Sequence, residues 1–285
     1  MPGYRFCRSD DLRLLVAAHN ACWVPHFGVD AAITIEDFKR GGRELGLWAS
    51  SCMIAFEGDE PIGVLIAAKR DGEANYVWRL AVKPGYERQG HGRHLLTSLA
   101  DKAAILGPPR LAAEIPAEWT AVRSFFERSG FVAEETYADF VLDPAPAAVV
   151  DAATAPLLVP VAFDDLVEHG VFDPTARRAW GRSTASLRAC ESALEGLALA
   201  TDRIEAYVIF RASRGGDERE IVALGAAPDV AAAPLLALLI ERVRAGGRRL
   251  RLPMLAERET SFATLERLGF RRARTTIGYA VARPA

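Results

Sequence analysis

The sequence predicts an α+β fold made of two similar domains, each a mostly antiparallel mixed sheet flanked by helices. Three observations lead to this prediction. The 285 residues exceed the usual length of a single domain. Segments with strand and helix periods alternate along the chain. Sequence features of the first half also recur, in the same order, in the second half.

The first half shows a clear order of elements. A strand is expected at residues 4–8 and a helix at 9–23, for which Ser9 is the expected N-cap. Thr34 is the expected cap of a second helix at 34–45. The elements expected after it are strands at 50–58, 60–70 and 74–82, a helix at about 90–106, a strand at 110–116, a helix at 118–130 closed by Gly130, and a final strand pair at 131–143.

Two motifs of the first half have counterparts in the second half. FFERSGF at 125–131 matches TLERLGF at 264–270, and RLAVKP, ending at Pro84, matches VALGAAP, ending at Pro228. The spacing from the proline to the motif glycine is five residues shorter in the second half (41 against 46), and the deficit falls where the first half has a glycine loop. Chance similarity of short apolar motifs is the alternative. The shared order and spacing favour a duplication whose second copy lost this loop.

The expected boundary between the copies is an Ala- and Pro-rich stretch without helix or strand period. It predicts a first domain at residues 1–143, a linker at 144–156 and a second domain at 157–285.

Bulk composition excludes several classes of protein. A formal net charge of −2 gives no general attraction to nucleic acid or to an anionic membrane. The four cysteines form no C-x-x-C pair, so buried free thiols in a reducing cytoplasm are expected, and no metal site. The N-terminal residues lack the apolar core of a signal peptide, and no apolar run is long enough to span a membrane.

A glycine pair marks the junction between the 74–82 strand and the helix that follows it. Gly90 and Gly92 stand in KPGYERQGHGRHLL, at 83–96, with several basic residues around them. Without side chains, successive backbone N–H groups can converge on an anion at the positive end of the helix. A plain turn that changes the chain direction is the alternative. The loop lacks the context of a dinucleotide fold and the Lys-Ser/Thr pair of a P-loop.

In this setting, LAVKPGYERQGHGRHLL resembles motif A of the GNAT superfamily of acyl-CoA-dependent N-acyltransferases, and AVRSFFERSGF resembles its motif B. The resemblance covers residues 4–142 and implies two GNAT-like domains, the first with an acetyl-CoA site. It assigns the pantetheine arm and the pyrophosphate to the following residues: Leu80, Ala81, Val82, Arg88, Gln89, Gly90, His91, Gly92 and Arg93. Glu87 departs from the motif, which prefers Arg or Gln at that position, and is expected to weaken binding without abolishing it.

The resemblance also suggests a catalytic base. Glu114 occupies the position of the Glu that some GNAT enzymes use to deprotonate the amine, and a solvent-facing strand carboxylate is the alternative. Phe126 occupies the position of their acid, a Tyr, and cannot donate a proton. Tyr137 and Tyr86 are candidate replacements, and a CoA thiolate is also able to leave unaided.

Acceptor selection in this family usually involves the first two helices and their connection. NACWVPHFGVD is unusually aromatic for such a loop, so Trp23, His26 and Phe27 are candidate substrate-binding residues. Alternatively, the two large rings fix the loop to the core and His26 has no role in binding.

The second half repeats the order of elements but lacks the residue types of the candidate active site, since Pro253 and Leu265 stand where the first half has Glu114 and Phe126. A degenerate domain that binds no CoA is expected, with a role in covering the cleft or in forming a homodimer. The overall prediction is a cytoplasmic N-acetyltransferase that acetylates a primary amine, of a small molecule or a peptide, by direct attack. The alternative is a catalytically silent acyl-CoA sensor or scaffold.

Overall fold

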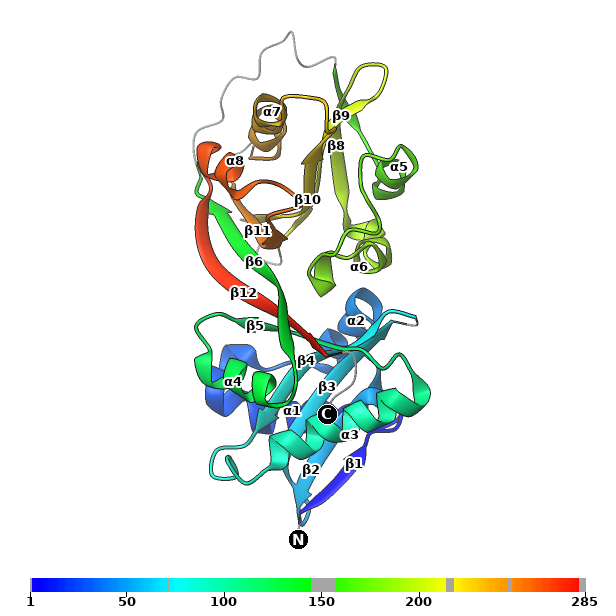
Figure 1. Ribbon diagram of the computed structural model, residues 1–285, viewed down its shortest axis with the longest axis vertical. Coiled ribbons are helices and arrows are strands. Elements are labelled where there is room, and N and C mark those ends of the chain that lie inside the picture. The colour runs from blue at the N-terminus through cyan, green and yellow to red at the C-terminus, as the bar shows by residue number, and fades with distance from the viewer. Residues whose placement is uncertain (1, 71, 145–156, 214–217, 245–247, 282–285) are drawn as a thin grey trace. The chain divides into compact units, whose positions relative to one another are not determined.

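The computed structural model describes residues 2–70, 72–144, 157–213, 218–244 and 248–281, which form two compact units (Figure 1). The first unit contains Met1–Glu134 and Ile277–Ala285, and the second contains Glu135–Thr276. Apart from Pro144, the expected linker lies outside the described residues.

The first unit is a mixed sheet with helices on its faces. Its strands follow the order β1-β2-β3-β4-β5 and end with the last part of β12. Neighbours from β1 to β4 are antiparallel, whereas β4 and β5 are parallel. Its elements are β1 (Gly3–Phe6), α1 (Leu12–Phe27), η1 (Val29–Ala31), α2 (Ile35–Leu45), η2 (Ala49–Ser51), β2 (Met53–Glu57), β3 (Glu60–Arg70), β4 (Ala74–Val82), α3 (His91–Leu106), β5 (Leu111–Pro116) and α4 (Thr120–Arg128).

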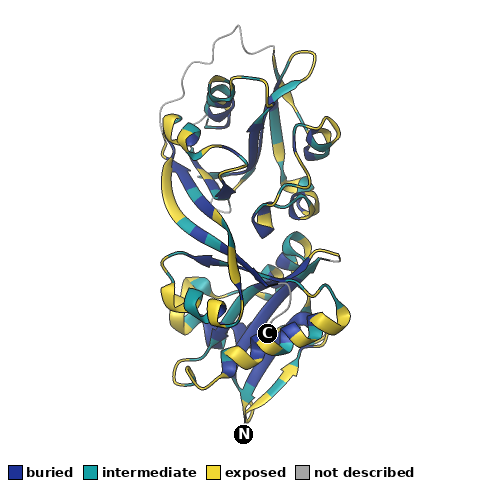
Figure 2. Ribbon diagram, in the orientation of Figure 1, coloured by how far each residue is buried: buried dark blue, intermediate teal, exposed yellow. Residues whose placement is uncertain are grey.

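The core of this unit lies between the sheet and α3. Leu95, Leu96 and Leu99 of α3 are nearly inaccessible and pack against Leu65 of β3 and Val77 of β4. The helical spacing of these leucines predicts this buried face, and the structure confirms it. Figure 2 shows β3 buried along most of its length, as expected for a central strand.

The start and the end of α1 differ from the prediction. The helix begins after Asp11, not at Ser9, because the Asp11 carboxylate accepts a hydrogen bond from the Arg8 backbone N–H at 2.8 Å and pairs with Arg5 at 2.6 Å. The helix also continues through Pro25 to Phe27, so most of the expected aromatic loop is helical. The predicted cap Thr34 is confirmed, and it forms a reciprocal capping box with Asp37.

The second unit repeats this plan. Its strands follow the order β6-β11-β10-β9-β8-β7, with the first part of β12 beside β6. Its elements are β7 (Leu158–Pro160), α5 (Phe163–Glu168), η4 (Trp180–Arg182), α6 (Thr184–Ala189), η5 (Glu191–Ala193), β8 (Glu195–Ala200), β9 (Ile204–Ala212), β10 (Glu218–Ala226), α7 (Ala232–Arg244), β11 (Arg249–Ala256) and α8 (Phe262–Arg267). The predicted fold class, two mostly antiparallel mixed sheets with flanking helices, is confirmed.

The two units exchange their final strands. The first half's last strand, the single strand β6 (Val132–Leu142), pairs with β11 in the second unit, and β12 (Arg271–Val281) ends in the first unit. Tyr279 of β12 is buried in the core of the first unit, while Phe140 of β6 is buried in that of the second. The first unit therefore includes a segment that the sequence prediction assigned to the second domain, and the expected final strand pair at 131–143 is one strand.

Candidate functional site

The first unit opens where β4 and β5 separate. The two parallel strands pair only from Asn75 to Val77 on β4, opposite Leu111–Ala113 on β5. The next β4 residue, Trp78, is an extra residue relative to β3, since Val77 pairs with Ala67 and Arg79 with Ile66. A bulge of this kind bends a strand, so β4 leaves β5 at this point.

Beyond the bulge, β4 presents backbone groups to the open edge. Lys83 N donates to Ile62 O of β3 at 2.8 Å. Because hydrogen-bonded and non-hydrogen-bonded residues alternate along an antiparallel pair, the N–H and C=O groups of Val82 and Leu80 point away from β3. The carbonyl of Val82 accepts a hydrogen bond from His26 Nε2 at 2.8 Å. Leu80 therefore offers the strand-like donor and acceptor that an acylated pantetheine arm requires.

The glycine loop leads directly into α3. Arg88 and Gly90 have positive φ angles of 61° and 93°, a conformation that a glycine adopts without strain. Gly90 is the N-cap of α3 and provides no side chain to cap it. The first N–H groups of the helix, which have no partner within a helix, are thus available to an anion.

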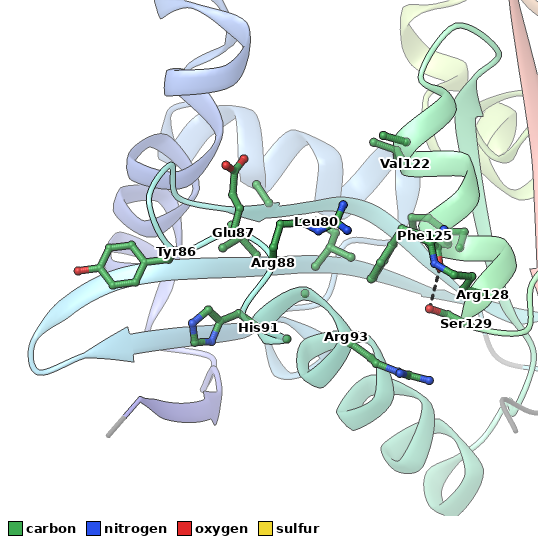
Figure 3. Close-up of a pocket in the computed structure, with 16 residues that line it drawn as sticks. Leu80, Tyr86, Glu87, Arg88, His91, Arg93, Val122, Phe125, Arg128 and Ser129 are labelled. Carbon is green, nitrogen blue, oxygen red and sulfur yellow. Dashed lines mark hydrogen bonds between the residues drawn. The ribbon is translucent and has the colours of Figure 1, made fainter.

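These features surround one pocket of about 630 Å³ (Figure 3). Its lining includes eight of the nine residues predicted to bind coenzyme A: Leu80, Ala81, Val82, Arg88, Gly90, His91, Gly92 and Arg93. The ninth, Gln89, does not line it, and its side-chain amide donates instead to Gly85 O at 3.1 Å. Glu87 also lines the pocket, and its carboxylate lies 3.8 Å from the His26 ring nitrogen.

The opposite wall comes from α4, which the sequence analysis did not assign to the cofactor. Phe125, Phe126, Arg128, Ser129 and their neighbours Ala121 and Val122 line this side. Arg128 places a further cation in the pocket beside Arg93 and Arg88. The amphipathic period of residues 120–128, with Val122, Phe125 and Ser129 at helical spacing, is the signal that points to this wall.

Glu114 stands at the start of the opening. It is the first β5 residue beyond the last pair, Val77 with Ala113. Tyr76 of β4 donates a hydrogen bond from its hydroxyl to Glu114 Oε2 at 2.9 Å. Tyr76 is buried. The sequence analysis did not identify it, because a tyrosine within a largely buried strand is usually a packing residue and nothing in its sequence context indicates contact with Glu114.

The candidate acid Tyr137 lies in the other unit. It is buried beside Ala179 and Ala256 in the second unit, so the first unit itself does not bring it to Glu114, and its catalytic role stays a prediction. Tyr86, the other candidate, lines the pocket at the loop.

Comparison with protein families gives one match. Residues 13–131 match the model of the acetyltransferase (GNAT) family. The matched segment contains β4, the glycine loop, α3 and α4, which together build the pocket. This segment, residues 13–131, is a GNAT-family domain.

Solved structures share the fold over the whole chain. A GCN5-related N-acetyltransferase from Sphaerobacter thermophilus superimposes with a TM-score of 0.69 at 15% identity, covering 100% of this chain and 96% of that one. A tandem GNAT protein from the clavulanic acid biosynthesis pathway gives 0.68 at 18% identity, with 100% of both chains covered. A putative acetyltransferase from Pyrococcus horikoshii gives 0.61 at 16%, covering 98% and 89%. At these identities the likeness shows the tandem GNAT fold alone.

No curated protein matches the chain. Within the described residues, no helix is long and apolar enough to cross a membrane, and no group of three or more His, Cys, Asp or Glu side chains is arranged to hold a metal ion.

The three predicted acceptor-binding residues lie on the last turns of α1 of the GNAT domain. Trp23 stacks on Phe27 at 4.3 Å between ring centroids, and Phe27 stacks on Trp119, ahead of α4, at 5.0 Å. His26 points to the end of β4 through its bond to Val82. Trp23 and Phe27 thus form a row of stacked rings with Trp119. His26 instead contacts the end of β4, just before the glycine loop. Their binding of an acceptor stays a prediction.

The second unit has the same strand separation, but one of its own side chains fills it. There, β10 and β11 pair only from Glu218 to Glu220, opposite Arg249–Arg251. The Nη1 atom of Arg182 donates to Ile221 O on β10 at 3.3 Å and to Pro253 O on β11 at 3.2 Å. Its guanidinium also pairs with Glu259 at 3.0 Å, and Arg178 reaches the same carboxylate at 3.2 Å.

This ion pair is almost fully buried, with Arg182 side-chain exposure of 3% and Glu259 of 5%. Both arginines therefore have an internal partner. The gap between β10 and β11 is therefore occupied by the Arg182 side chain, and the absence of coenzyme A binding by this unit stays a prediction.

Proposed function

We propose that the GNAT domain of this chain transfers an acetyl group from acetyl-CoA to a primary amine of a small-molecule or peptide acceptor. The pocket of about 630 Å³ carries the proposal, because it joins two separate binding elements. The uncapped start of α3 suits the pyrophosphate, and the open edge of β4 at Leu80 suits the pantetheine arm with its thioester. The cations Arg88, Arg93 and Arg128 add attraction for the phosphates.

The reaction is a direct attack in a ternary complex. The neutral amine attacks the thioester carbonyl carbon, a C–N bond forms, and the C–S bond breaks with release of the CoA thiolate. Glu114 accepts the proton that the amine loses, directly or through water, and the hydroxyl of Tyr76 holds that carboxylate in place. The thiolate leaves without a protein acid, consistent with Phe126 at the motif B position.

Cysteine burial supports the absence of an acyl-enzyme. All four cysteines are buried. Burial raises the pKa of the Cys7 and Cys22 thiols to about 12, so they stay protonated near neutrality. A protonated thiol is a poor nucleophile.

A silent acyl-CoA sensor is the second candidate function, and Phe126 favours it, because this buried ring offers no proton where some GNAT enzymes have a Tyr. The sensor binds acetyl-CoA but releases no thiol.

Calorimetric titration of acetyl-CoA into the full-length protein, followed by a thiol-release assay with an amine panel, tests the proposal. We expect one site per chain. Gly92→Phe should abolish binding, because a side chain there extends toward Val82 and Phe125, within 4 Å of its Cβ. The matched control is Gly3→Ala, at an exposed position with open space around the new Cβ.

Glu114→Gln should keep acetyl-CoA binding but lower turnover by about 10²–10⁴-fold. Binding without thiol release from any amine favours the sensor. Absence of binding at high micromolar acetyl-CoA overturns both functions, and two sites per chain contradict the closed cleft of the second unit.

A further inference from the structure

A cation of the GNAT domain lies between two tryptophan rings, just past the bulge in β4. The guanidinium carbon of Arg79 is 4.4 Å from the ring centroid of Trp78 and 4.7 Å from that of Trp23. One guanidinium nitrogen donates to the Trp78 carbonyl at 3.2 Å. Among the described residues, no carboxylate forms an ion pair with Arg79.

Such an environment is unusual for an arginine. Partial burial lowers the pKa of Arg79, because the charged form loses hydration, and cations shielded from water in proteins are normally paired. The guanidinium carbon lies over both rings. The N–H donors lie in the guanidinium plane, and those that do not reach Trp78 O form the planar fork that binds a carboxylate through two parallel hydrogen bonds.

A second polar group in the same cluster also lacks a partner. His19 is fully buried, and its ring stacks on Trp23 at 5.7 Å and on Trp78 at 6.5 Å. In the part of the chain that the structure describes, no group forms a hydrogen bond with its Nε2 atom. A buried polar atom without a partner is rare in folded proteins and needs an explanation.

The neighbours of His19 fix which ring nitrogen carries the proton. Asn20 donates from Nδ2 to Ile33 O at 3.0 Å and accepts from Ile33 N at Oδ1, at 2.9 Å. Because Oδ1 is an acceptor, the His19 Nδ1 atom, 3.0 Å from it, must be the donor. In the neutral ring, Nε2 then holds a lone pair and lacks a donor.

The cluster stands beside the proposed base. The last paired residues of β4 and β5 are Val77 and Ala113. Arg79 follows two residues later on one strand, and Glu114 one residue later on the other. The fold itself does not require this cation: in the second unit, β10 has its bulge at Val222, and the next residue is Ala223.

We propose that the acceptor amine carries a carboxylate group, which Arg79 binds beside the buried His19 ring. The inference rests on the proposed function, since it names the class of amine that the GNAT domain acetylates. Trp23 and Trp78 then act as the walls that hold the guanidinium in position.

Matched acceptors test the inference on the full-length protein. Free amino acids are compared with their carboxamides, together with simple alkylamines and amino sugars, and release of the CoA thiol is measured. We expect kcat/KM for the acid to exceed that for its amide by roughly 10- to 100-fold, as for a charge-assisted hydrogen-bonded pair. Arg79→Met should remove this preference and leave the KM for acetyl-CoA unchanged.

Two further variants separate recognition from folding. Arg79→Lys keeps the charge without the fork, and we expect it to reduce the acid-to-amide ratio by about threefold or more. Arg13→Met, at an exposed position of α1, is the matched control and should keep the full ratio. Calorimetric binding of acetyl-CoA by each variant shows that the domain is folded.

The outcomes are distinct. Turnover confined to amines without a carboxylate, or a preference that persists in Arg79→Met, overturns the inference and leaves the acetyltransferase function intact. Acetyl-CoA binding without thiol release from any acceptor overturns the proposed function, and the inference with it.

Discussion

Replacing Glu259 by glutamine tests whether an internal ion pair closes the cleft of the second unit. The Glu259 carboxylate is the shared partner of Arg182 and Arg178, whose side chains are 3% and 7% exposed. It also accepts a hydrogen bond from Ala256 N at 3.0 Å. Glutamine has nearly the same shape but no charge, so the change leaves two buried guanidinium groups without a counter-charge.

The expected loss is large. Removing one partner of a buried ion pair costs about 3–5 kcal/mol, because the remaining charge is buried without compensation. With a urea dependence of about 2 kcal/mol per molar, the midpoint of unfolding of the second unit should fall by roughly 2 M. Asp164→Asn is the matched control: its partner is Arg188, about half of each side chain is exposed, and loss of such a surface pair costs about 1 kcal/mol or less.

Hydrogen exchange measured by mass spectrometry in a urea series resolves peptides of β10 and β11 from those of the first unit. Loss of protection in these strands at lower urea is the expected result. A midpoint shift no larger than that of Asp164→Asn would refute the reasoning, because it would mean that Arg182 does not depend on its carboxylate partner.

Three further predictions concern the first unit. Tyr279→Phe removes two hydrogen bonds to α4, including the one donated to Glu127 at 2.7 Å. It should lower the free energy of unfolding by about 1 kcal/mol in urea denaturation, and an unchanged value would contradict the role of this hydroxyl. Burial, with a contribution from the Arg79 charge, lowers the pKa of His19. Below pH about 6.5 the unfolded chain therefore binds a proton at His19 that the folded chain does not. As the pH is lowered below this value, the free energy of unfolding should decrease in wild type, and it should decrease less steeply in His19→Gln. Cys7 and Cys22, with pKa values of about 12, should resist iodoacetamide at pH 8 until urea unfolds the domain, and rapid labelling of the native protein would contradict their burial.

The sequence was sufficient for the fold class and for most of the residues on β4 and the glycine loop that line the pocket of the first unit. The period of the apolar residues indicates each main element, and the repeated motif spacing indicates two copies. The glycine loop has a local signal, since Gly90 and Gly92 follow a strand and precede a helix. These features depend on neighbours in sequence, which is why they can be recognised without a structure.

Other features depend on contacts between distant residues. The final strands of the two halves have the same spacing, nine residues from Phe131 to Phe140 and nine from Phe270 to Tyr279, so the sequence does not show which sheet each one joins. Arg79 and Arg182 both look like ordinary charged residues. Only the structure shows that the first lies between tryptophans without a carboxylate, and that the second bridges two strands in a buried ion pair.

The exchange of final strands also has a consequence for synthesis. Residues of β12 beyond Ile277 are synthesised after the second unit, yet they are the strand beside β5 in the first sheet. Until then, β5 is an unpaired edge that other chains can bind. Domains usually fold in the order in which they are made, but here the first unit cannot complete its sheet until the second unit has been synthesised. A stop codon just before β12 would therefore damage the first unit, although all its other strands would have been made.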